Sequence, residues 1–209
     1  MVVEDCIWLI LKGLLATVVI SMLSLLIGTL VGCGLYALST SKHRWMQKIA
    51  QWWKVAVRGT PLMVLILIVF YLLFGGRCPI LAASIALGLI FANFVATNLK
   101  SSIDAVGHGQ MEAGQMLGFS KIQTMRYIVL PQAIRIGLPA YKFQAVATVK
   151  GTAVVGYVAI QDLTLATQAI RSGTGHDLLP LLVTTLIYFL LAWLLNKLFD
   201  YIFLRIQKI

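Results

Sequence analysis

The chain has 209 residues, of which 60% are hydrophobic and only 11% are charged, yet its formal net charge is +10. A soluble domain could not bury so large an apolar share, so lipid must surround much of the chain. The positive charge fits basic loops at an anionic cytoplasmic membrane surface better than nucleic-acid binding, because no basic patch is interleaved with aromatic residues away from the membrane edges. The three cysteines have neither metal-binding spacing nor even pairing, which argues against a disulfide framework.

The first apolar segment covers residues 13–38 and is long enough to cross a bilayer with some tilt. Glu4 and Asp5 precede it with a charge opposite to that of a signal peptide, so we expect the segment to remain in the protein. Gly28 and Gly32 form a small-residue pair that allows two helices to approach closely. We expect this pair to pack inside the chain's own bundle, because such pairs are common in membrane spans; a dedicated dimer face is the alternative.

Residues 39–59 form the most basic connection of the chain. Its basic residues are Lys42, His43, Arg44, Lys48, Lys54 and Arg58. Because cytoplasmic loops carry an excess of lysine and arginine, this connection is expected inside the cell and the N-terminus outside. Trp45, Trp52 and Trp53 indicate an amphipathic helix at the membrane interface.

The second span opens at Pro61 and ends near Phe74, before a Gly-Gly pair. It is about one turn or more too short for a full crossing, so either it begins deeper in the membrane or its helix begins in the preceding segment. The third span, residues 79–99, is apolar apart from a few polar side chains, and Lys100 opens the next cytoplasmic loop.

This loop contains residues 110–131, which are expected to form two short helices. Gly118 stands where a left-handed helix end favours glycine, and Ser120 followed by Gln123 is typical of a capping box that starts the second helix. Pro131 is expected to interrupt that helix. Its apolar residues are expected to share one face: Ile122, Met125, Ile128 and Val129. Physics alone leaves two interpretations, a helical hairpin lying on the membrane and an element that docks on a partner.

The same loop resembles the EAA motif of ATP-binding cassette (ABC) importer permeases in residue identity and spacing. Gly114 stands where the family usually has a second alanine, which is expected to loosen the first turn while keeping the spacing. The resemblance implies that the loop is the coupling helix that sits in a groove of the cytoplasmic ATPase. The residues that it assigns to ATPase coupling are Glu112, Ala113, Gly114, Gly118, Leu130 and Pro131.

The fourth membrane segment, residues 136–160, is irregular and contains Lys150. A lysine at the centre of a membrane helix costs about 2.5–3.5 kcal/mol, so Lys150 should face a partner or a watery cavity. Gly151 and Thr152 beside it predict a broken helix, which is tolerated only where it lines protein or a pore. Two roles are open for Lys150: pairing with backbone groups or Asp162, and contact with the α-carboxylate of an amino acid. The candidate residues for such a solute path are Lys150, Thr152, Gln144 and Asn98.

Residues 161–177 form a second outside segment, and the last span covers residues 178–201. Lys197, Arg205 and Lys208 place the C-terminus in the cytoplasm. The sequence therefore predicts an all-α integral membrane protein with five transmembrane helices, in which residues 1–209 form one transmembrane domain. The alternative assignment of Asn98 is a solvated polar residue at the membrane edge.

Catalytic and nucleotide-binding motifs are absent from the sequence. It contains no GxxxxGKS or GxxxxGKT phosphate loop, so any nucleotide site lies on another chain. It has no HExxH, CxxC or GxSxG pattern and no carboxylate cluster in a span, which leaves no candidate catalytic residue and no candidate metal site. Five spans with one broken segment also lack the repeated halves of most secondary transporters. A simple channel, and a scaffold or regulatory protein that binds an ATPase through the same loop, stay as alternatives.

The segment RGTPL at residues 58–62 also resembles the start of a helix in the polar amino acid subgroup of these permeases, which transports histidine, glutamate, glutamine, arginine and opines. The resemblance implies a MetI-like fold in the inner membrane of a bacterium, with a solute delivered by an extracytoplasmic binding protein. It further implies two paired permease chains above a cytoplasmic ABC ATPase dimer. ATP and magnesium would bind to that ATPase, and no cofactor to this chain.

Two positions depart from this subgroup. Asn98 stands where the family often has a glutamate, and Gly151 and Ala153 replace the Asp and Ser of a Lys-Asp-Thr-Ser segment. Both departures remove a carboxylate from the expected pathway. They favour a neutral or acidic solute, or a chain that is one half of an unequal pair.

Overall fold

The structure is a computed structural model that describes residues 3–207, and its regular elements there are all helical. α1 (Val3–Ser39) has 37 residues, about 55 Å at 1.5 Å per residue, and exceeds a hydrocarbon core about 30 Å thick. The sequence placed the start of this span at Gly13. It begins earlier because Glu4 and Asp5 fit into its first turn, where the helix dipole favours negative charge. Lys208, assigned above to the cytoplasm, lies outside the described residues.

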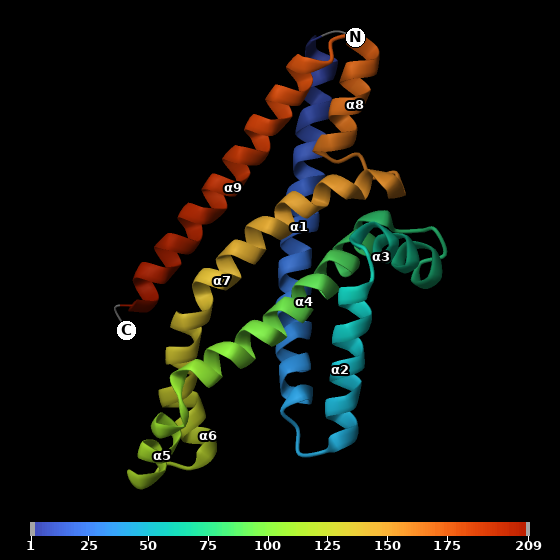
Figure 1. Cartoon of the computed structure of the whole chain (residues 1–209). Coiled ribbons are helices and arrows are strands. Elements are labelled where there is room, and N and C mark those ends of the chain that lie inside the picture. Colours follow the sequence, from blue (N-terminus) through green and yellow to red (C-terminus); the bar gives the residue numbers. More distant parts are fainter. Residues whose placement is uncertain (1–2, 208–209) are drawn as a thin grey trace.

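α2 (Arg44–Gly59) returns alongside the C-terminal part of α1 (Figure 1). The predicted helix in residues 39–59 is thus present, and it packs against α1 and α4 (Pro79–Val106). After α2, the axis turns by 112° into α3 (Leu62–Ile68) and a π-helical turn, η1 (Val69–Leu73). The helix of the short second span therefore begins in the preceding segment and breaks near Pro61, which has no backbone N–H to continue it.

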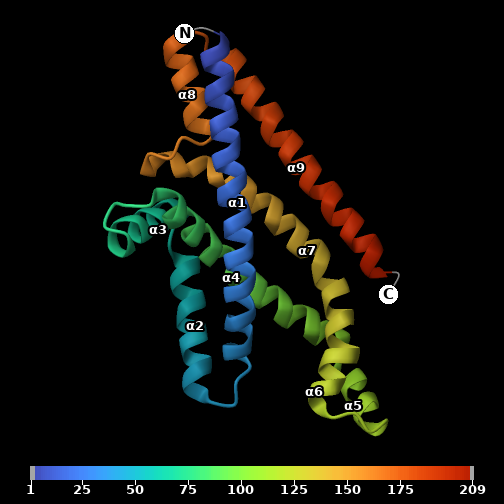
Figure 2. The ribbon, with the colours of Figure 1, turned by 180° about the vertical axis from the view of Figure 1, so that it is seen from behind.

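α4 (Pro79–Val106) is the central helix, with α1, α2 and α7 (Leu130–Gly151) packed against it. It crosses α1 obliquely, in front of α1 in Figure 1 and behind it in Figure 2. It also continues past Lys100, so the third span is longer than predicted. α3 (Leu62–Ile68) contacts it as well, so α4 fixes the relative positions of these four helices.

The crossing of α1 and α4 depends on glycine. A Cβ atom placed on Gly28 would lie 2.7 Å from the carbonyl oxygen of Gly88, and one placed on Gly32 would lie 2.6 Å from Cβ of Val95. Contacts this short mean that the two backbones meet directly at both positions. The expectation that Gly28 and Gly32 pack inside the chain's own bundle is therefore confirmed. Gly34 has no atom within 4 Å of such a Cβ.

α5 (His108–Met116) and α6 (Lys121–Thr124) form a small hairpin at the lower end of the molecule (Figure 1). From α6 the chain stays helical through a π-helical turn, η2 (Met125–Val129), into α7. Pro131 therefore does not interrupt the second helix, contrary to the prediction. Proline within an α-helix removes one hydrogen bond and clashes with the preceding turn. The wider π-helical turn, which ends two residues before Pro131, gives the proline ring the space it needs.

At its far end α7 passes into a 3-10 turn, η3 (Thr152–Val158), and α8 (Leu163–Thr174) follows after a bend of 56°. α9 (Leu178–Gln207) then runs along the outside of the bundle (Figures 1 and 2). Within the described residues, three helices, α1, α4 and α9, are long and apolar enough to cross a membrane. The number becomes five if the bent pairs formed by α2 with α3 and by α7 with α8 each count as one crossing. The second pair would then include α8, whose residues were predicted to lie in an outside segment.

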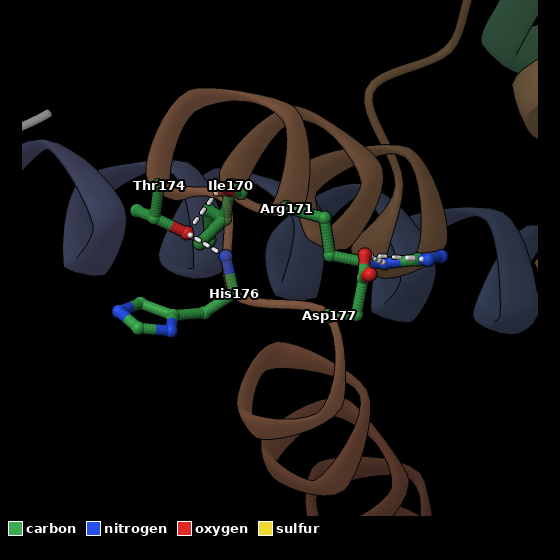
Figure 3. A network of polar contacts seen from close by, with 5 residues as sticks. All are labelled: Ile170, Arg171, Thr174, His176 and Asp177. Carbon is green, nitrogen blue, oxygen red and sulfur yellow. Dashed lines mark hydrogen bonds and ion pairs between the residues drawn. The ribbon is translucent and has the colours of Figure 1, made fainter.

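Local contacts hold the turn between α8 and α9 (Figure 3). Nη2 of Arg171 lies 2.9 Å from Oδ1 of Asp177. The hydroxyl of Thr174 donates to the carbonyl oxygen of Ile170 and accepts the backbone N–H of His176. These contacts close the turn on itself and fix the angle at which α9 leaves α8.

We predict that Gly32→Leu destabilises the protein by about 1–3 kcal/mol, because the added side chain must overlap Val95 at the crossing of α1 and α4. Gly34→Leu is the matched control, since it adds the same side chain two residues away in open space. The measurement is the thermal unfolding midpoint of both purified variants in detergent. Equal midpoints for the two variants would contradict the role of Gly32 in this crossing.

Candidate functional site

The α5–α6 hairpin is built by the two local signals found in the sequence. Gly118 has φ +87°, a conformation that glycine adopts without strain. The hydroxyl of Ser120 accepts the N–H of Gln123 at 3.3 Å, and the side chain of Gln123 accepts the N–H of Ser120 at 2.8 Å. The left-handed helix end and the capping box are thus both confirmed, and together they fix the angle between the two short helices.

Gly114 closes the hairpin from inside. It is buried, and a Cβ atom at this position would lie 2.4 Å from Cγ2 of Thr124. Thr124 is itself fully buried and donates its hydroxyl to the carbonyl oxygen of Ser120. The expectation that glycine loosens the first turn is wrong, because Gly114 allows α5 to pack closely against the threonine of α6.

The tip of the hairpin exposes large apolar side chains beside a carboxylate. Met116, Leu117 and Ile122 are 89%, 76% and 80% exposed, and Glu112 is also exposed. Ile122 therefore does not share a face with Val129, which is buried. An apolar cluster beside a charge on a protruding element is typical of a surface that a protein partner covers.

The remaining residues of the EAA-like pattern occupy different positions around the hairpin. Ala113 is exposed on α5, whereas Leu130 and Pro131 begin α7 and lead the chain out of the loop. Glu112, Ala113 and Gly118 can thus reach a partner directly. Gly114, Leu130 and Pro131 are placed to shape and support the hairpin.

Lys150 lies at the predicted helix break. The α-helix changes to a 3-10 turn at Thr152, which confirms the broken helix. Lys150 is exposed and lines a cavity of about 400 Å³ together with Ala153, Thr185, Tyr188, Phe189 and Ala192. Among the described residues it forms no ion pair, with Asp162 or with any other acid. A cavity beside an unpaired lysine is an arrangement that can accept an anionic group.

The other candidates for the solute path do not all meet Lys150. Thr152 is fully buried and donates its hydroxyl to the carbonyl oxygen of Val149 at 2.7 Å. Gln144 is half-buried, six residues before Lys150 on α7, or about 9 Å along the axis. Asn98 is further from Lys150 than Gln144 is, because it contacts α7 at Gly137.

Asn98 links α4 to α7. Its side-chain amide donates to the carbonyl oxygen of Gly137 at 2.9 Å. Gly137 precedes Lys150 by 13 residues of α7, which is about 20 Å of helix. Asn98 and Lys150 therefore do not form one site, and the contact that Asn98 makes is structural.

Asp162 is a residue at the helix break that the sequence analysis considered only as a partner for Lys150. It is fully buried, and its Oδ1 accepts the N–H of Leu165 at 2.9 Å, which makes it the N-cap of α8. α1 crosses directly above it, because a Cβ atom on Gly13 would lie 2.7 Å from the carbonyl oxygen of Asp162. An aspartate immediately before the apolar α8 segment was a usable capping signal.

Asp162 also faces a cavity of about 260 Å³, which Ala153, Tyr157, Thr164 and Gln168 help to line. Ala153 lines this cavity and the one at Lys150. The break between α7 and α8 therefore places the cation of Lys150 and the carboxylate of Asp162 at two neighbouring cavities.

We predict that Gly114→Ala destabilises the hairpin by about 1–3 kcal/mol through its overlap with Thr124, and that adding Thr124→Ala restores most of the loss. Gly109→Ala is the control, because this glycine of α5 has open space around it. The measurement is the rate of proteolysis at the hairpin, supported by the thermal midpoint. A double variant as unstable as the single one would refute the packing explanation.

Comparisons with known proteins agree with this architecture. Residues 24–208 match the family described as binding-protein-dependent transport system inner membrane component. The chain is 31% identical over 191 residues to the arginine transport system permease protein ArtQ of Bacillus subtilis, covering 90% of this chain and 87% of that protein.

Two solved structures share the fold. A crystal structure of an amino acid ABC transporter with histidines has a TM-score of 0.85 and 30% identity and covers 94% of both chains. An inward-facing structure of the MetNI methionine ABC transporter has a TM-score of 0.80 at 19% identity, with 98% of this chain and 99% of that chain covered. Because the family match spans most of its length, the chain belongs to the family of inner membrane components of binding-protein-dependent transport systems.

Proposed function

We propose that this permease subunit of an ABC importer translocates a polar amino acid, which an extracytoplasmic binding protein delivers and a separate ATPase dimer drives across the membrane. The observation that carries the proposal is the α5–α6 hairpin, a rigid and exposed element in a chain of this family that has no phosphate loop of its own. The names of the related proteins, which concern arginine and amino acid transport, support the solute class. ATP and magnesium would bind to the partner ATPase.

A second permease chain, identical or different, would pair with this one. α9 supports such a partner, because it packs against the bundle along one side and exposes apolar residues along the others, such as Leu182, Leu186 and Phe189. Lipid would cover the part of this surface that a second chain leaves free.

The chain would lie in the inner membrane with its N-terminus outside and its C-terminus in the cytoplasm. The connection between α1 and α2 and the α5–α6 hairpin lie at the same end of the molecule (Figure 1). Basic residues surround both: Lys42 lies in the first with Arg44 directly after it, and Lys121 lies in the second with Arg126 shortly after it. The positive-inside rule assigns that end to the cytoplasm. This orientation presents the hairpin to a cytoplasmic ATPase.

Lys150 is the residue that we expect to hold the α-carboxylate of the solute. It is unpaired among the described residues, lies at a helix break and lines a cavity. Thr152 and Gln144 would then support the shape of this part of the path, and Asn98 would hold α4 and α7 together below it. The two alternative functions explain less of the structure. A channel would not need the exposed α5–α6 hairpin, and a scaffold that only binds an ATPase would not need a cavity at Lys150.

We predict that Glu112→Lys and Gly118→Pro each lower binding-protein-stimulated ATP hydrolysis about tenfold or more in proteoliposomes that contain the complete importer. Lysine reverses the charge on the docking surface, and proline cannot adopt the φ of +87° that Gly118 requires. Lys42→Glu, a charge reversal in the other turn at the same end, is the control. Stimulation at the wild-type level in both variants would exclude the hairpin as the coupling element. Uptake that needs no ATP would instead indicate a channel.

We predict that Lys150→Met lowers solute uptake about tenfold or more while the permease still assembles with its ATPase, because methionine keeps the apolar stem and removes the charge. Lys142→Met is the comparison, since Lys142 is on the same helix but forms an ion pair with Asp200 of α9. Uptake by liposomes and co-purification of the ATPase are measured together. A variant that loses assembly would assign Lys150 a structural role, and one with normal uptake would remove it from the solute path.

A further inference from the structure

α2 has a buried side and an exposed side. Ala50 and Val57 are buried against the bundle. Trp45, Ile49 and Trp52 are 61%, 52% and 75% exposed, and their spacing of four and three residues places them together on one side of the helix. Large apolar side chains that are exposed on a helix of a membrane protein face lipid. This side of α2 is therefore in contact with the bilayer.

Two cations share the exposed side of α2 with the tryptophans. Lys48 is exposed and lies three residues after Trp45 and four before Trp52, so the three side chains are neighbours on the helix surface. Arg44 is also exposed and precedes Lys48 by one turn. Val55, which is 66% exposed, follows Lys48 by two turns and continues the apolar surface. Arg44 and Lys48 thus lie beside side chains that face lipid.

The level of these side chains in the membrane follows from their place in the fold. They belong to the first half of α2, which begins at the connection from α1, at the same end of the molecule as the α5–α6 hairpin (Figure 1). Tryptophan is enriched at the level of the lipid headgroups. Lysine and arginine keep their apolar stems in lipid and extend their charges to the same level. Arg44 and Lys48 can therefore reach the phosphate of a lipid that contacts Trp45 and Trp52.

No acidic residue of the chain is placed to neutralise these two cations. The sequence contains no aspartate or glutamate between Asp5 and Asp104. Among the described residues, neither Arg44 nor Lys48 forms an ion pair. Like charges four residues apart on a helix repel each other. An anion bound beside both side chains would remove this repulsion.

The protein partners proposed for this chain have other surfaces. α9, the proposed surface for a second permease chain, lies on the opposite side of the bundle from α2 (Figures 1 and 2). The ATPase is proposed to dock on the α5–α6 hairpin. The side of α2 that carries the tryptophans is therefore left to lipid.

We propose that the exposed side of α2 binds the headgroup of an anionic phospholipid, with Arg44 and Lys48 as its ligands. The assignment of this lipid to the cytoplasmic leaflet rests on the proposed orientation of the chain. The lipid phosphate accepts charge-assisted hydrogen bonds from the guanidinium of Arg44 and the ammonium of Lys48. Trp45 and Trp52 pack along the glycerol and the upper part of the acyl chains. A zwitterionic lipid offers the same phosphate, but its choline group adds a positive charge beside two cations.

The bound lipid has a structural consequence. From the other end of α2 the axis turns by 112° into α3. A headgroup held by Arg44 and Lys48 fixes the depth of α2 in the membrane, and it thereby fixes the level at which this turn occurs.

The test measures the quenching of tryptophan fluorescence in the permease assembled with its ATPase. The complex is placed in liposomes that contain phosphatidylglycerol or phosphatidylcholine with brominated acyl chains. The difference between the unaltered protein and Trp45→Phe/Trp52→Phe isolates the signal of these two exposed tryptophans. We expect phosphatidylglycerol to bind beside them about fivefold or more tightly than phosphatidylcholine, because two cations at the membrane surface attract anionic lipid. Arg44→Gln/Lys48→Gln should lower this preference to less than about twofold.

α2 also provides the matched control, Lys54→Gln/Arg58→Gln. This variant removes one lysine and one arginine at the same spacing from the same helix, but Nη2 of Arg58 donates to the hydroxyl of Thr97 on α4. It should leave the preference unchanged to within about twofold, because these side chains lie away from the tryptophans. Arg44→Lys/Lys48→Arg keeps both charges and should keep the preference, which separates a lost charge from a lost fold.

Three results would overturn the lipid site. The first is equal affinity of the two lipids for the unaltered protein. The second is an unchanged preference in Arg44→Gln/Lys48→Gln; if this variant instead loses the ATPase or the second permease chain, the exposed side of α2 is a protein contact. The third is an equal loss of preference in the matched control, which would show attraction to the overall charge. Failure of every amino acid to be taken up would refute the proposed function and leave the lipid site standing, because the quenching needs no transport.

Discussion

The direct backbone contact between α1 and α4 is the constraint on which the other helix positions depend. Lipid is as apolar as the side chains it surrounds, so helices in a membrane are held by close packing rather than by hydrophobic burial. Gly28 and Gly32 provide that packing against Gly88 and Val95. With one side of α4 fixed in this way, its other sides are free to receive α2 and α7. The α5–α6 hairpin follows directly from this helix, and α7, which carries Lys150, packs against it.

The α5–α6 hairpin is held at both ends by helices that are themselves tied together. α4 leads into it through a single glycine, Gly107, and α7 leads out of it without leaving the helical conformation. Just above the hairpin, Asn98 of α4 bonds to the carbonyl oxygen of Gly137 on α7. A Cβ atom on Gly137 would lie 2.5 Å from the hydroxyl of Ser102, so the two helices are in close contact there. A displacement of the hairpin would therefore move α4 and α7 as one unit.

The sequence predicted features that depend on a few neighbouring residues. Gly118 and the pair of Ser120 with Gln123 specify their backbone contacts locally, and the structure confirms both. The broken helix at Thr152 was predicted for a similar reason, because a lysine followed by glycine has a clear cost in a membrane. Such local signals do not predict contacts between residues that are far apart in the sequence.

Features that depend on distant partners were predicted wrongly or missed. The tryptophans of α2 indicated a helix at the membrane interface, but they did not reveal its contacts with α4. There the backbone carbonyl oxygen of Lys54 accepts from Asn93 and the side chain of Arg58 donates to Thr97, each partner some forty residues later in the chain. Periodicity identifies a polar sector but does not say whether water, lipid or another helix lies beside it. The bond from Asn98 to the carbonyl oxygen of Gly137 on α7 was likewise missed, because this partner is not visible in the neighbouring sequence.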